Sequence, residues 1–459
     1  MNKQSRTKMP LRPAALRAHD FHEVALGFSE EEVKREASRC MQCKGAPCMQ
    51  GCPVSVHIPA FLAKVREGDF AAAGKLIGKT SSLPAVCGRV CPQEAQCEKC
   101  CLRGKVDAPV AIGGVERFVG DYMLSHRQAP TPAAQTGKRV AVVGSGPAGL
   151  TCAAELSKCG VAVTVFEASH KAGGVLVYGI PEFRLPKRLV QQEIEALEAH
   201  GVEIRLNTVV GKTVPVEELL SAYDAVFLAS GAGLPLFMNI PGENLNGVYS
   251  ANEYLTRVNL MQAYRENSAT PVWRGGQVTV VGAGNVAMDA ARTALRMGAE
   301  SVRVVYRRTR EEMPARKEEI EHAEEEGIEF MLLTDPVALV GEQGCVTAMR
   351  CVKTQLGAPD ASGRRLPMRI EGSEFTLKTD MVIVALGTAP NPLIRRSFAA
   401  LKTTEKGCIV VDEESMQTSV PRLYAGGDAV TGAATVILAM GAGRKASQAI
   451  LQSLGVTSK

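Results

Sequence analysis

The sequence predicts an α/β protein in which a helical, cysteine-rich N-terminal domain precedes two Rossmann-like domains, the second inserted into the first. Three observations support this prediction. Nine of the 14 cysteines lie between Cys40 and Cys101. A strand, a glycine-rich turn and a helix follow one another twice after this region. A third strand, which runs into Gly-Gly-Asp, precedes a helix near the C-terminus.

The length and composition are those of an ordinary globular protein. With 459 residues, of which 46% are hydrophobic and 22% charged, the chain has room for about three domains. The net charge of +5 is small and evenly spread, so neither nucleic acid nor a membrane is expected as a partner. Residues Met1–Pro10 are polar and basic, and no apolar run is long enough to span a bilayer. We therefore expect reduced thiols and a cytoplasmic location.

Residues 1–135 are predicted to form the cysteine-rich domain. The expected helices cover residues 29–40, Pro59–Glu67 and Phe70–Ile77. Ser29 followed by Glu32 has the spacing of a capping box, which marks the start of the first helix and places Cys40 at its end. The stretch Gln128–Gly137, rich in Pro, Thr and Ala, is the expected linker to the next domain.

The cysteines of this domain form two groups with short, regular gaps. They read Cys40-x2-Cys43-x4-Cys48-x3-Cys52 and Cys87-x3-Cys91-x5-Cys97-x3-Cys101, with Cys100 as a spare. Short gaps let one turn of backbone direct several thiolates at one centre, which soft metals require. Pro53, directly after Cys52, is typical of bacterial ferredoxins, in which the last cysteine of the run ligates the other cluster. Two 4Fe-4S clusters are favoured; two structural zinc sites are the alternative, and a disulfide framework is disfavoured.

The first dinucleotide-binding pattern begins with the strand Arg139–Val143. The glycine turn consists of Gly144, Ser145, Gly146, Pro147, Ala148 and Gly149. The helix Leu150–Lys158 follows, and its N-terminus would face a pyrophosphate. A second strand, Val161–Phe166, ends on Glu167, whose carboxylate accepts hydrogen bonds from a ribose diol and repels a 2′-phosphate. This copy therefore predicts FAD or NAD, and not NADP.

The second pattern differs at the residue that decides the cofactor. Its turn consists of Gly282, Ala283, Gly284, Asn285 and Val286, with Ala287 in place of the third glycine. The second strand, Ser301–Tyr306, ends on Arg307 and Arg308 instead of an acid. Two guanidinium groups can hold a 2′-phosphate, so we expect NADPH; a solvated basic strand end is the alternative. Arg310 and Arg316 lie close enough in sequence to contribute.

The third pattern, Arg422–Ala425 followed by Gly426, Gly427 and Asp428, is typical of flavoenzymes with two dinucleotide domains. In these enzymes the chain returns to the flavin at this point and the acid reaches its ribityl or pyrophosphate end. The predicted domains are therefore 136–271 with 385–459 for FAD, and an inserted 272–384 for NADPH. Asp428 as a helix N-cap is the competing interpretation.

From about residue 20 onward the sequence resembles a known family, on five segments. These are Cys-Met-Gln-Cys from Cys40, Cys-Gly-Arg-Val-Cys-Pro from Cys87, Ile-Gly-Gly-Val-Glu from Ile112, Gly-Ile-Pro-Glu-Phe-Arg-Leu-Pro from Gly179, and Ala-Gly-Gly-Asp from Ala425. The resemblance is to the small (beta) subunits of NADPH-dependent glutamate synthase. The N-terminal half of dihydropyrimidine dehydrogenase and the large subunit of the bifurcating NADH-dependent ferredoxin:NADP oxidoreductase share these segments.

The resemblance implies specific ligands. One cluster would take Cys40, Cys43, Cys48 and Cys101, and the other Cys52, Cys91, Cys97 and Glu116. Cys87 and Cys100 would then not be ligands, whereas spacing alone groups each run of cysteines separately. The flavin contacts of the family fall on Gly174, Val175, Arg184, Val210, Asp428, Thr435 and Val436. For Arg184, a surface cation beside Lys187 and Arg188 is the alternative.

The resemblance also implies a function. NADPH would pass a hydride to FAD, and the two clusters would carry single electrons to an FMN-containing large subunit that makes glutamate from glutamine and 2-oxoglutarate. No catalytic side chain is expected, because the cofactors carry the chemistry. The alternatives are an electron-transfer subunit of a dihydropyrimidine dehydrogenase or of a bifurcating complex with a ferredoxin-like acceptor, and a non-catalytic, zinc-stabilised NADP-binding sensor.

Overall fold

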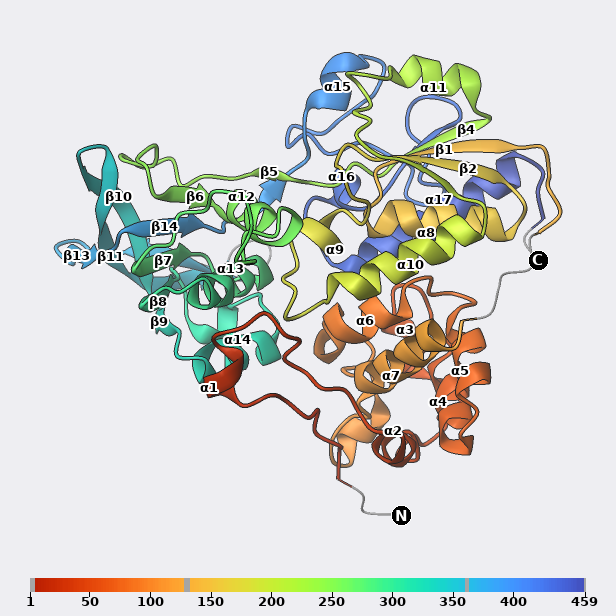
Figure 1. Cartoon of the computed structure of the whole chain (residues 1–459), viewed down its shortest axis with the longest axis horizontal. Coiled ribbons are helices and arrows are strands. Elements are labelled where there is room, and N and C mark those ends of the chain that lie inside the picture. Colours follow the sequence, from red (N-terminus) through yellow and green to blue (C-terminus); the bar gives the residue numbers. More distant parts are fainter. Residues whose placement is uncertain (1–4, 128–132, 360–362, 458–459) are drawn as a thin grey trace.

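The computed structural model describes residues 5–127, 133–359 and 363–457, and it contains three bodies (Figure 1). A helical domain forms the lower right part of the view, a first α/β domain lies above it, and a second α/β domain lies to the left. The expected linker falls partly on residues 128–132, which lie outside the described residues. The described chain resumes at residue 133 and enters the first sheet at Arg139.

The helical domain consists of short helices joined by cysteine-bearing loops. Its elements are α2 Glu30–Ala37, α3 Pro47–Gln50, α4 Ile58–Glu67, α5 Phe70–Ile77, α6 Pro84–Val90, α7 Ile112–Ser125 and the short turns η1 Gln93–Ala95 and η2 Leu102–Lys105. The predicted capping box is present, since the Ser29 side chain accepts from the Glu32 amide and Glu32 accepts from the Ser29 amide. The helix ends at Ala37, however, so Cys40 lies in the loop beyond it.

The first α/β domain is built on a parallel sheet in the order β16-β4-β1-β2-β3. Its strands are β1 Arg139–Val143, β2 Ala162–Phe166, β3 Glu203–Arg205, β4 Ala225–Leu228 and β16 Leu423–Ala425. Its helices are α8 Pro147–Lys158, α9 Val175–Tyr178, α10 Lys187–Ala199, α11 Val216–Ala222, α15 Leu393–Ser397, α16 Asp428–Thr431 and α17 Val436–Ser453. Because β16 pairs in parallel with β4, the C-terminal strand does return to this sheet. The predicted single helix after it is divided into α16 and α17.

The second sheet has the order β6-β14-β7-β8-β9 and is also parallel. Its strands are β6 Val248–Ser250, β7 Gln277–Val281, β8 Ser301–Val305, β9 Glu329–Met331 and β14 Met381–Val384. Its helices are α12 Ala251–Leu255, α13 Asn285–Arg296 and α14 Lys317–Glu325; η3 Thr256–Leu260 follows α12 and η4 Arg310–Glu312 precedes α14. The predicted boundary at residue 272 is therefore too late for this sheet. Three residues of β6 are too short a pattern to recognise, and only pairing with β14 reveals them.

Antiparallel strands form the rest of the second domain and the two connections between the α/β domains. An antiparallel sheet is formed by β10 Thr334–Glu342, β11 Cys345–Pro359, β12 Arg365–Arg369 and β13 Phe375–Lys378. The two strands β5 Leu234–Pro235 and β15 Thr388–Ala389 pair with each other where the chain enters and leaves the second domain.

The N-terminal arm, residues 5–28, leaves the helical domain and lies against the second α/β domain. It contains α1 Ala14–Arg17, which lies beside α14 (Figure 1). Phe21 stacks on Tyr264 with ring centroids 4.5 Å apart, and the Val24 amide donates to the carbonyl of Phe183. Residues 5–28 therefore do not belong to the helical domain alone.

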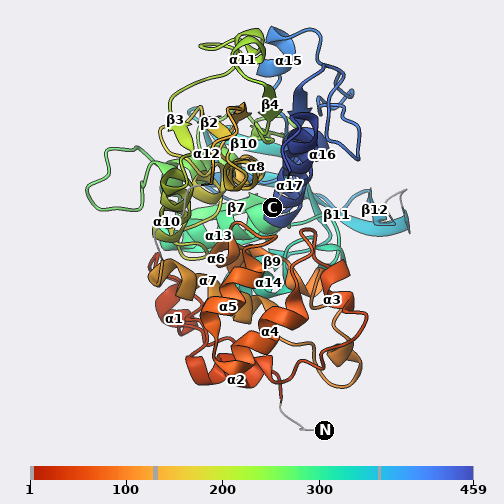
Figure 2. The same cartoon turned by 90° about the vertical axis from the view of Figure 1, so that its right-hand side faces the viewer.

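The buried apolar residues form separate clusters, one of which is shared by two of the three domains. Buried residues of the helical domain and of the first sheet form one continuous cluster, which includes Phe61, Val86, Val142 and Leu150. The helical domain lies beneath α8, α10 and α17 in both views, and α6 contacts α10 and α17 (Figure 2). The second domain has a separate core. Within the described part of the chain, no helix has the length and apolar character needed to cross a membrane.

Candidate cofactor sites

The first glycine turn is shaped for close approach of a phosphate. Gly144 has a φ of 101°, and a Cβ on Gly149 would lie 1.9 Å from the Gly144 carbonyl oxygen, so only glycine fits there. Gly146 is the N-cap of α8; it has no side chain to cap the helix, and the position that a Cβ would occupy is open. The first amides of α8 are therefore available to an anion, which fits the pyrophosphate of a dinucleotide.

Glu167 holds this turn together from the end of β2. Its side chain is buried and accepts hydrogen bonds from the Ser145 amide at 3.0 Å and from the Ser145 hydroxyl. The amide of Thr208 donates to the Glu167 carbonyl, which brings the segment containing Val210 to the same end of the sheet. A carboxylate anchored at this place fits the ribose-binding role predicted for Glu167.

The other predicted flavin residues converge on the same turn. A Cβ on Gly174, just before Val175, would lie 2.8 Å from the Cα of Gly146. A Cβ on Gly427 would lie 2.9 Å from the Ala148 Cβ. The Thr435 hydroxyl caps α17 by accepting from the Leu438 amide, and Val436 is the first residue of that helix. Segments from three distant parts of the chain thus meet at one place.

Asp428 is the first residue of α16, and Gly427 is its N-cap, so the N-cap alternative for Asp428 is wrong. Burial raises the pKa of Asp428 to about 6, although the carboxylate accepts a hydrogen bond from the Ala434 amide. Tyr178 was not expected from sequence: burial, followed by the nearby carboxylates of Asp428 and Glu167, raises its pKa to about 12. Tyr178 is a partly buried residue close to two acids, and a lone tyrosine in a short helix gives no sequence pattern to detect it.

The second glycine turn keeps the first two glycines of the pattern, Gly282 and Gly284, and has Ala287 in place of the third. A Cβ on Gly282 would lie 2.4 Å from the Ala385 carbonyl oxygen, and Gly284 is the N-cap of α13 with no side-chain cap. Ala287, at the third glycine position, is fully buried. The Asn285 side chain accepts a hydrogen bond from the Arg316 amide at 2.9 Å, which ties α13 to the loop before α14. The free amides at the start of α13 fit a second pyrophosphate.

The four arginines near this turn have different surroundings. Arg307 is exposed, whereas Arg308 is buried and its Nε donates to the Arg365 carbonyl at 2.8 Å. Arg310 pairs with Glu324. Arg316 donates to the carbonyl of Arg89 and to the side chain of Gln93, both in the helical domain. Arg310 and Arg316 therefore have partners elsewhere, and the 2′-phosphate role predicted for Arg307 and Arg308 stays a prediction.

The structure groups the cysteines differently from their spacing. Cys40, Cys43, Cys48 and Cys101, here called the outer group, line a small cavity of about 20 Å³. Burial and the neighbouring thiols of Cys101 and Cys40 raise the pKa of Cys48 to about 12. Within the described residues, no three His, Cys, Asp or Glu side chains converge on a point that could hold a single metal ion. The four thiols line one cavity, and their role as ligands of a 4Fe-4S cluster stays a prediction.

The inner group consists of Cys52, Cys91, Cys97 and Glu116 from α7. Burial alone raises the pKa of Glu116 to about 8. Burial, then the carboxylates of Glu98 and Glu116 and the thiol of Cys52, raises the pKa of Cys97. The electrostatic influence of Glu116 and Cys52 on Cys97 indicates that these side chains lie near one another, and the role of the inner group as ligands stays a prediction.

The two remaining cysteines differ in their surroundings, and the Cys87 thiol lies beside the inner group, where it is hydrogen-bonded with the thiol of Cys91. Cys87 is buried, and its thiol contacts the Met440 sulfur of α17 at 3.4 Å. Cys100 faces Gly51, where a Cβ would lie 2.9 Å from its sulfur. The non-ligand role that the resemblance implies for both cysteines stays a prediction.

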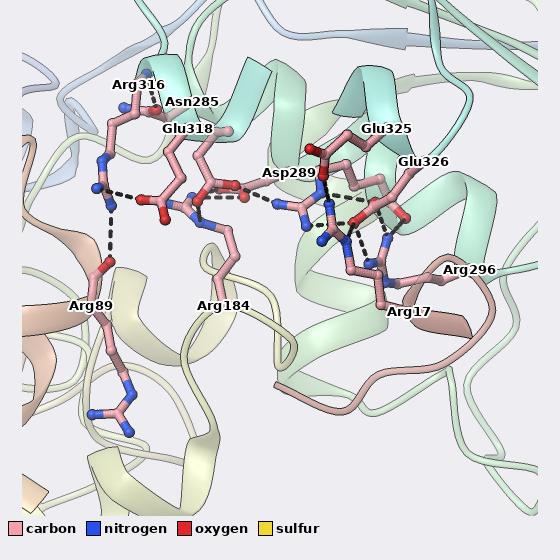
Figure 3. Close-up of polar contacts among 12 residues, drawn as sticks. Arg17, Arg89, Arg184, Asn285, Asp289, Arg296, Arg316, Glu318, Glu325 and Glu326 are labelled. Carbon is pink, nitrogen blue, oxygen red and sulfur yellow. Dashed lines mark hydrogen bonds and ion pairs between the residues drawn. The ribbon is translucent and has the colours of Figure 1, made fainter. Parts of the chain in front are cut away.

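Arg184 is buried between the two α/β domains, and its predicted flavin contact stays a prediction. Its side chain is buried, so the surface-cation alternative is wrong. Its guanidinium donates to both oxygens of Asp289, at 2.7 and 2.8 Å, and forms an ion pair with Glu319 at 2.9 Å (Figure 3). Both partners belong to the second α/β domain, on α13 and α14.

Comparison with known proteins agrees with this division of the chain. Residues 17–128 match the family model described as dihydropyrimidine dehydrogenase domain II, 4Fe-4S cluster. Residues 104–222 and 138–449 match the model of the pyridine nucleotide-disulphide oxidoreductases. Fold and sites together define an α/β pyridine-nucleotide oxidoreductase with an N-terminal iron–sulfur domain.

Curated relatives show which family within this class of oxidoreductases the chain belongs to. The chain is 38% identical to the glutamate synthase (NADPH) small chain of Escherichia coli K12 over 98% of each chain. It is 41% identical to the putative oxidoreductase AegA of the same organism, over 95% of this chain and 68% of that one. It is also 41% identical to the NADP(+)-dependent formate dehydrogenase subunit beta of Moorella thermoacetica, over 90% of this chain and 61% of that one. The chain belongs to the family of the glutamate synthase (NADPH) small chains.

Solved structures share the fold of the two α/β domains. FprA from Mycobacterium tuberculosis in complex with NADPH superposes with a TM-score of 0.58 and 21% identity over 69% of this chain and 84% of that one. Thioredoxin reductase from T. acidophilum gives a TM-score of 0.52 and 20% identity over 69% of this chain and 98% of that one.

Proposed function

We propose that this chain is the electron-transfer subunit of an NADPH-dependent glutamate synthase. It delivers electrons from NADPH, by way of FAD and two 4Fe-4S clusters, to a partner catalytic subunit that makes glutamate from glutamine and 2-oxoglutarate. The observation that carries the proposal is the continuous apolar core of the helical and flavin domains, which holds both cysteine groups at fixed places beside the flavin helices. The match to glutamate synthase small chains over almost their whole length supports this choice of partner.

The chain's own residues bind and orient the cofactors. When bound, FAD takes a hydride with its electron pair from NADPH, leaving NADP+, and then releases electrons singly to the clusters. The uncapped starts of α8 and α13 hold the two pyrophosphates, and Glu167 and Arg307 select a free ribose and a 2′-phosphate respectively. The cysteines of both groups, with Glu116, hold the clusters.

The contacts of the inner group suggest the order of transfer. The loop after Cys52 lies against α17, since Arg444 donates to the Val54 carbonyl at 3.2 Å and Gly441 packs on the carbonyl of Pro53. Helix α17 begins at the predicted flavin contact Val436. The outer group lies nearer the solvent, beside Met41, which is 39% exposed. Electrons would therefore pass from flavin to the inner group, then to the outer group and the partner.

The test uses protein prepared without oxygen. Iron, acid-labile sulfide and FAD are measured per chain, and flavin bleaching is followed with NADPH and with NADH. We expect about eight irons per chain for two 4Fe-4S clusters, bleaching by NADPH, and glutamate formation only after a glutamate synthase large subunit is added. Stoichiometric zinc without a visible absorption band would contradict the proposal, and so would intact electron transfer that never supports glutamate formation.

A second candidate is an NADPH module for a different catalytic partner. It is favoured by the high identity to AegA and to the formate dehydrogenase beta subunit, both longer than this chain. Co-purification of the native complex decides between the two: a large subunit with glutamine-dependent activity supports glutamate synthase, and another oxidoreductase subunit supports this alternative.

A further inference from the structure

The junction between the NADPH domain and the rest of the molecule contains a network of buried charges. The network consists of Arg17, Arg184, Arg292, Arg296, Asp289, Glu319, Glu325 and Glu326 (Figure 3). Four positive charges face four negative ones, and only Glu325 is substantially exposed. Such a network is balanced as a whole, but removal of one member leaves a buried charge without a partner.

The members come from three separate segments. Arg17 belongs to the N-terminal arm and pairs with Glu326 at 3.0 Å. Arg184 belongs to the flavin domain, between α9 and α10, and is the only flavin-domain member of the network. All other members lie on α13 and α14 of the NADPH domain, apart from Glu326, which directly follows α14. These polar contacts join the NADPH domain to the flavin domain, together with the paired strands β5 and β15 and the packing of η3 against α9.

Phe183 strengthens the attachment at Arg184. Its ring is fully buried, and the guanidinium groups of Arg292 and Arg296 lie 4.9 and 3.9 Å from its centroid. Two consecutive flavin-domain residues are thus fixed on one face of α13: Phe183 by stacking, and Arg184 by its contacts with Asp289.

The link joins the two elements that would carry the cofactors. Asp289 lies one helical turn after Asn285, at the start of α13, where NADPH would bind. Arg184 lies shortly after α9, whose first residue is the predicted flavin contact Val175. A shift of Arg184 relative to Asp289 would therefore change the distance between nicotinamide and flavin.

We propose that Arg184 is a positioning residue for flavin reduction, which holds α13 and α14 at a fixed place against the flavin domain and does not contact the flavin itself. The proposal rests on the proposed function only in that the two cofactors are NADPH and FAD. Transfer between two bound reactants depends steeply on their separation, and a misplacement of about 1 Å can cost about 100-fold in rate.

The test compares three variants of the holoenzyme. Arg184→Met breaks the link and leaves one buried negative charge unpaired. The double variant Arg184→Met with Asp289→Asn also breaks the link but restores charge balance, and with it much of the stability. The control Arg257→Met removes an arginine from the exposed pair with Glu253.

Two measurements are made on each variant. The first is the first-order rate of flavin reduction at saturating NADPH in a single turnover, with FAD content and absorption spectrum recorded. The second is hydrogen–deuterium exchange of α13, α14 and residues 179–186. We expect both Arg184 variants to reduce the flavin about 10- to 100-fold more slowly, with FAD content and spectrum unchanged and exchange increased in these segments. The control should match the wild type.

Other results of these measurements would contradict the role proposed for Arg184. Recovery of the rate in the double variant would show that Arg184 matters for stability alone, and loss of FAD or a shifted flavin spectrum would make it a flavin contact. If neither variant folds, Arg184→Lys keeps the charge but cannot span both carboxylates, and an undiminished rate in it would overturn the proposal. A wild type that NADPH cannot reduce would refute the proposed function, while the exchange measurement would still test the link.

Discussion

At the end of β8 two adjacent arginines have unlike roles. Arg308 is buried, and its Nε donates to the Arg365 carbonyl, so it braces the antiparallel extension against the nucleotide domain. Arg307 is exposed beside the turn that would hold NADPH. The same residue type thus supports the fold at one position and is exposed to solvent at the next.

This difference predicts the effect of Arg307→Ala. The loss of a charge-assisted contact to a 2′-phosphate should raise the dissociation constant of NADPH about 10- to 100-fold, since such hydrogen bonds contribute about 1.5–3 kcal/mol. The dissociation constant of NADH, which lacks the phosphate, should change little. Titration of both nucleotides measures this, with Arg303→Ala on the same strand as the control. An equal loss for both nucleotides would refute the 2′-phosphate role.

Lys187, close to Arg184 in the chain, makes a second residue-scale prediction. Burial lowers its pKa to about 7, with the nearby Arg184 adding to the effect, although Glu182 and Asp289 oppose it. Between pH 7 and about 10 the unfolded chain, with a lysine pKa of about 10.4, binds more protons than the folded one, so folding stability from this group rises with pH. Wild type should gain stability relative to Lys187→Met between pH 7.5 and 9.5, by up to about 1.4 kcal/mol per pH unit.

Chemical denaturation at several pH values measures this difference. Lys64→Met, which removes an exposed lysine paired with Glu67, is the control and should show no pH-dependent gap. Parallel stability curves for wild type and Lys187→Met would rule out a depressed pKa for this lysine.

At the scale of elements, the contact of α8 with α17 closes the flavin site. The two helices approach closely because Gly443 of α17 faces the backbone of Ala148, where a Cβ would lie 2.1 Å from the carbonyl oxygen. Ala148 belongs to the glycine turn, so this crossing connects the C-terminal segment to the pyrophosphate end of the flavin site. If α8 and α17 separated, the pyrophosphate end of the predicted flavin site would lose its support from the C-terminal segment.

Gly443→Ala tests this contact. Overpacking of a close helix crossing costs about 1–3 kcal/mol, so we expect a lower melting temperature and weaker retention of FAD. Gly104→Ala is the control, because its Cβ would meet Pro109 only at ordinary contact distance, 3.5 Å or more. Absorbance of FAD in the protein fraction after gel filtration and thermal melting give the two readouts. Normal FAD retention in Gly443→Ala would argue against this contact as a support of the site.

At the scale of the whole molecule, the apolar clusters of the described residues divide the protein into unequal parts. The helical domain shares a cluster with one face of the first sheet, and this cluster includes cysteines of both groups; the other face of that sheet packs a separate cluster. The NADPH domain has its own core and is joined to the rest of the molecule by the crossing strands, the N-terminal arm and the buried charges. Such a division keeps electron carriers at fixed separations and gives the nucleotide its own domain.

Calorimetry of the holoprotein should therefore resolve two unfolding transitions. NADP+ binds the folded NADPH domain, so at about 100 times its dissociation constant it should stabilise that transition by about 2.7 kcal/mol and shift the other one less. A single unfolding transition whose midpoint rises with NADP+ would contradict this expectation. It would mean that the buried charges make the two parts of the molecule unfold together. Calorimetry with NAD+ at the same concentration is the control.

The sequence determined by itself the elements whose signals are local. The two strand–glycine–helix turns, the capping box before α2 and the arginines in place of an acid after β8 are all read from neighbouring residues, because turn geometry and ribose recognition depend on short spacings. The resemblance supplied the pairing of Cys101 with the first cysteines and of Glu116 with the second set. Their gaps in the chain could not, since spacing groups each run with itself.

Only the tertiary structure decided how these parts meet. It placed β6 in the second sheet, carried the N-terminal arm onto α14 and buried Arg184 against Asp289, residues that are more than 100 positions apart in the chain. A buried charge shows in the sequence as an ordinary charged residue, because what makes it acceptable in the interior is a partner from another segment. That partner is known only when the chain has folded.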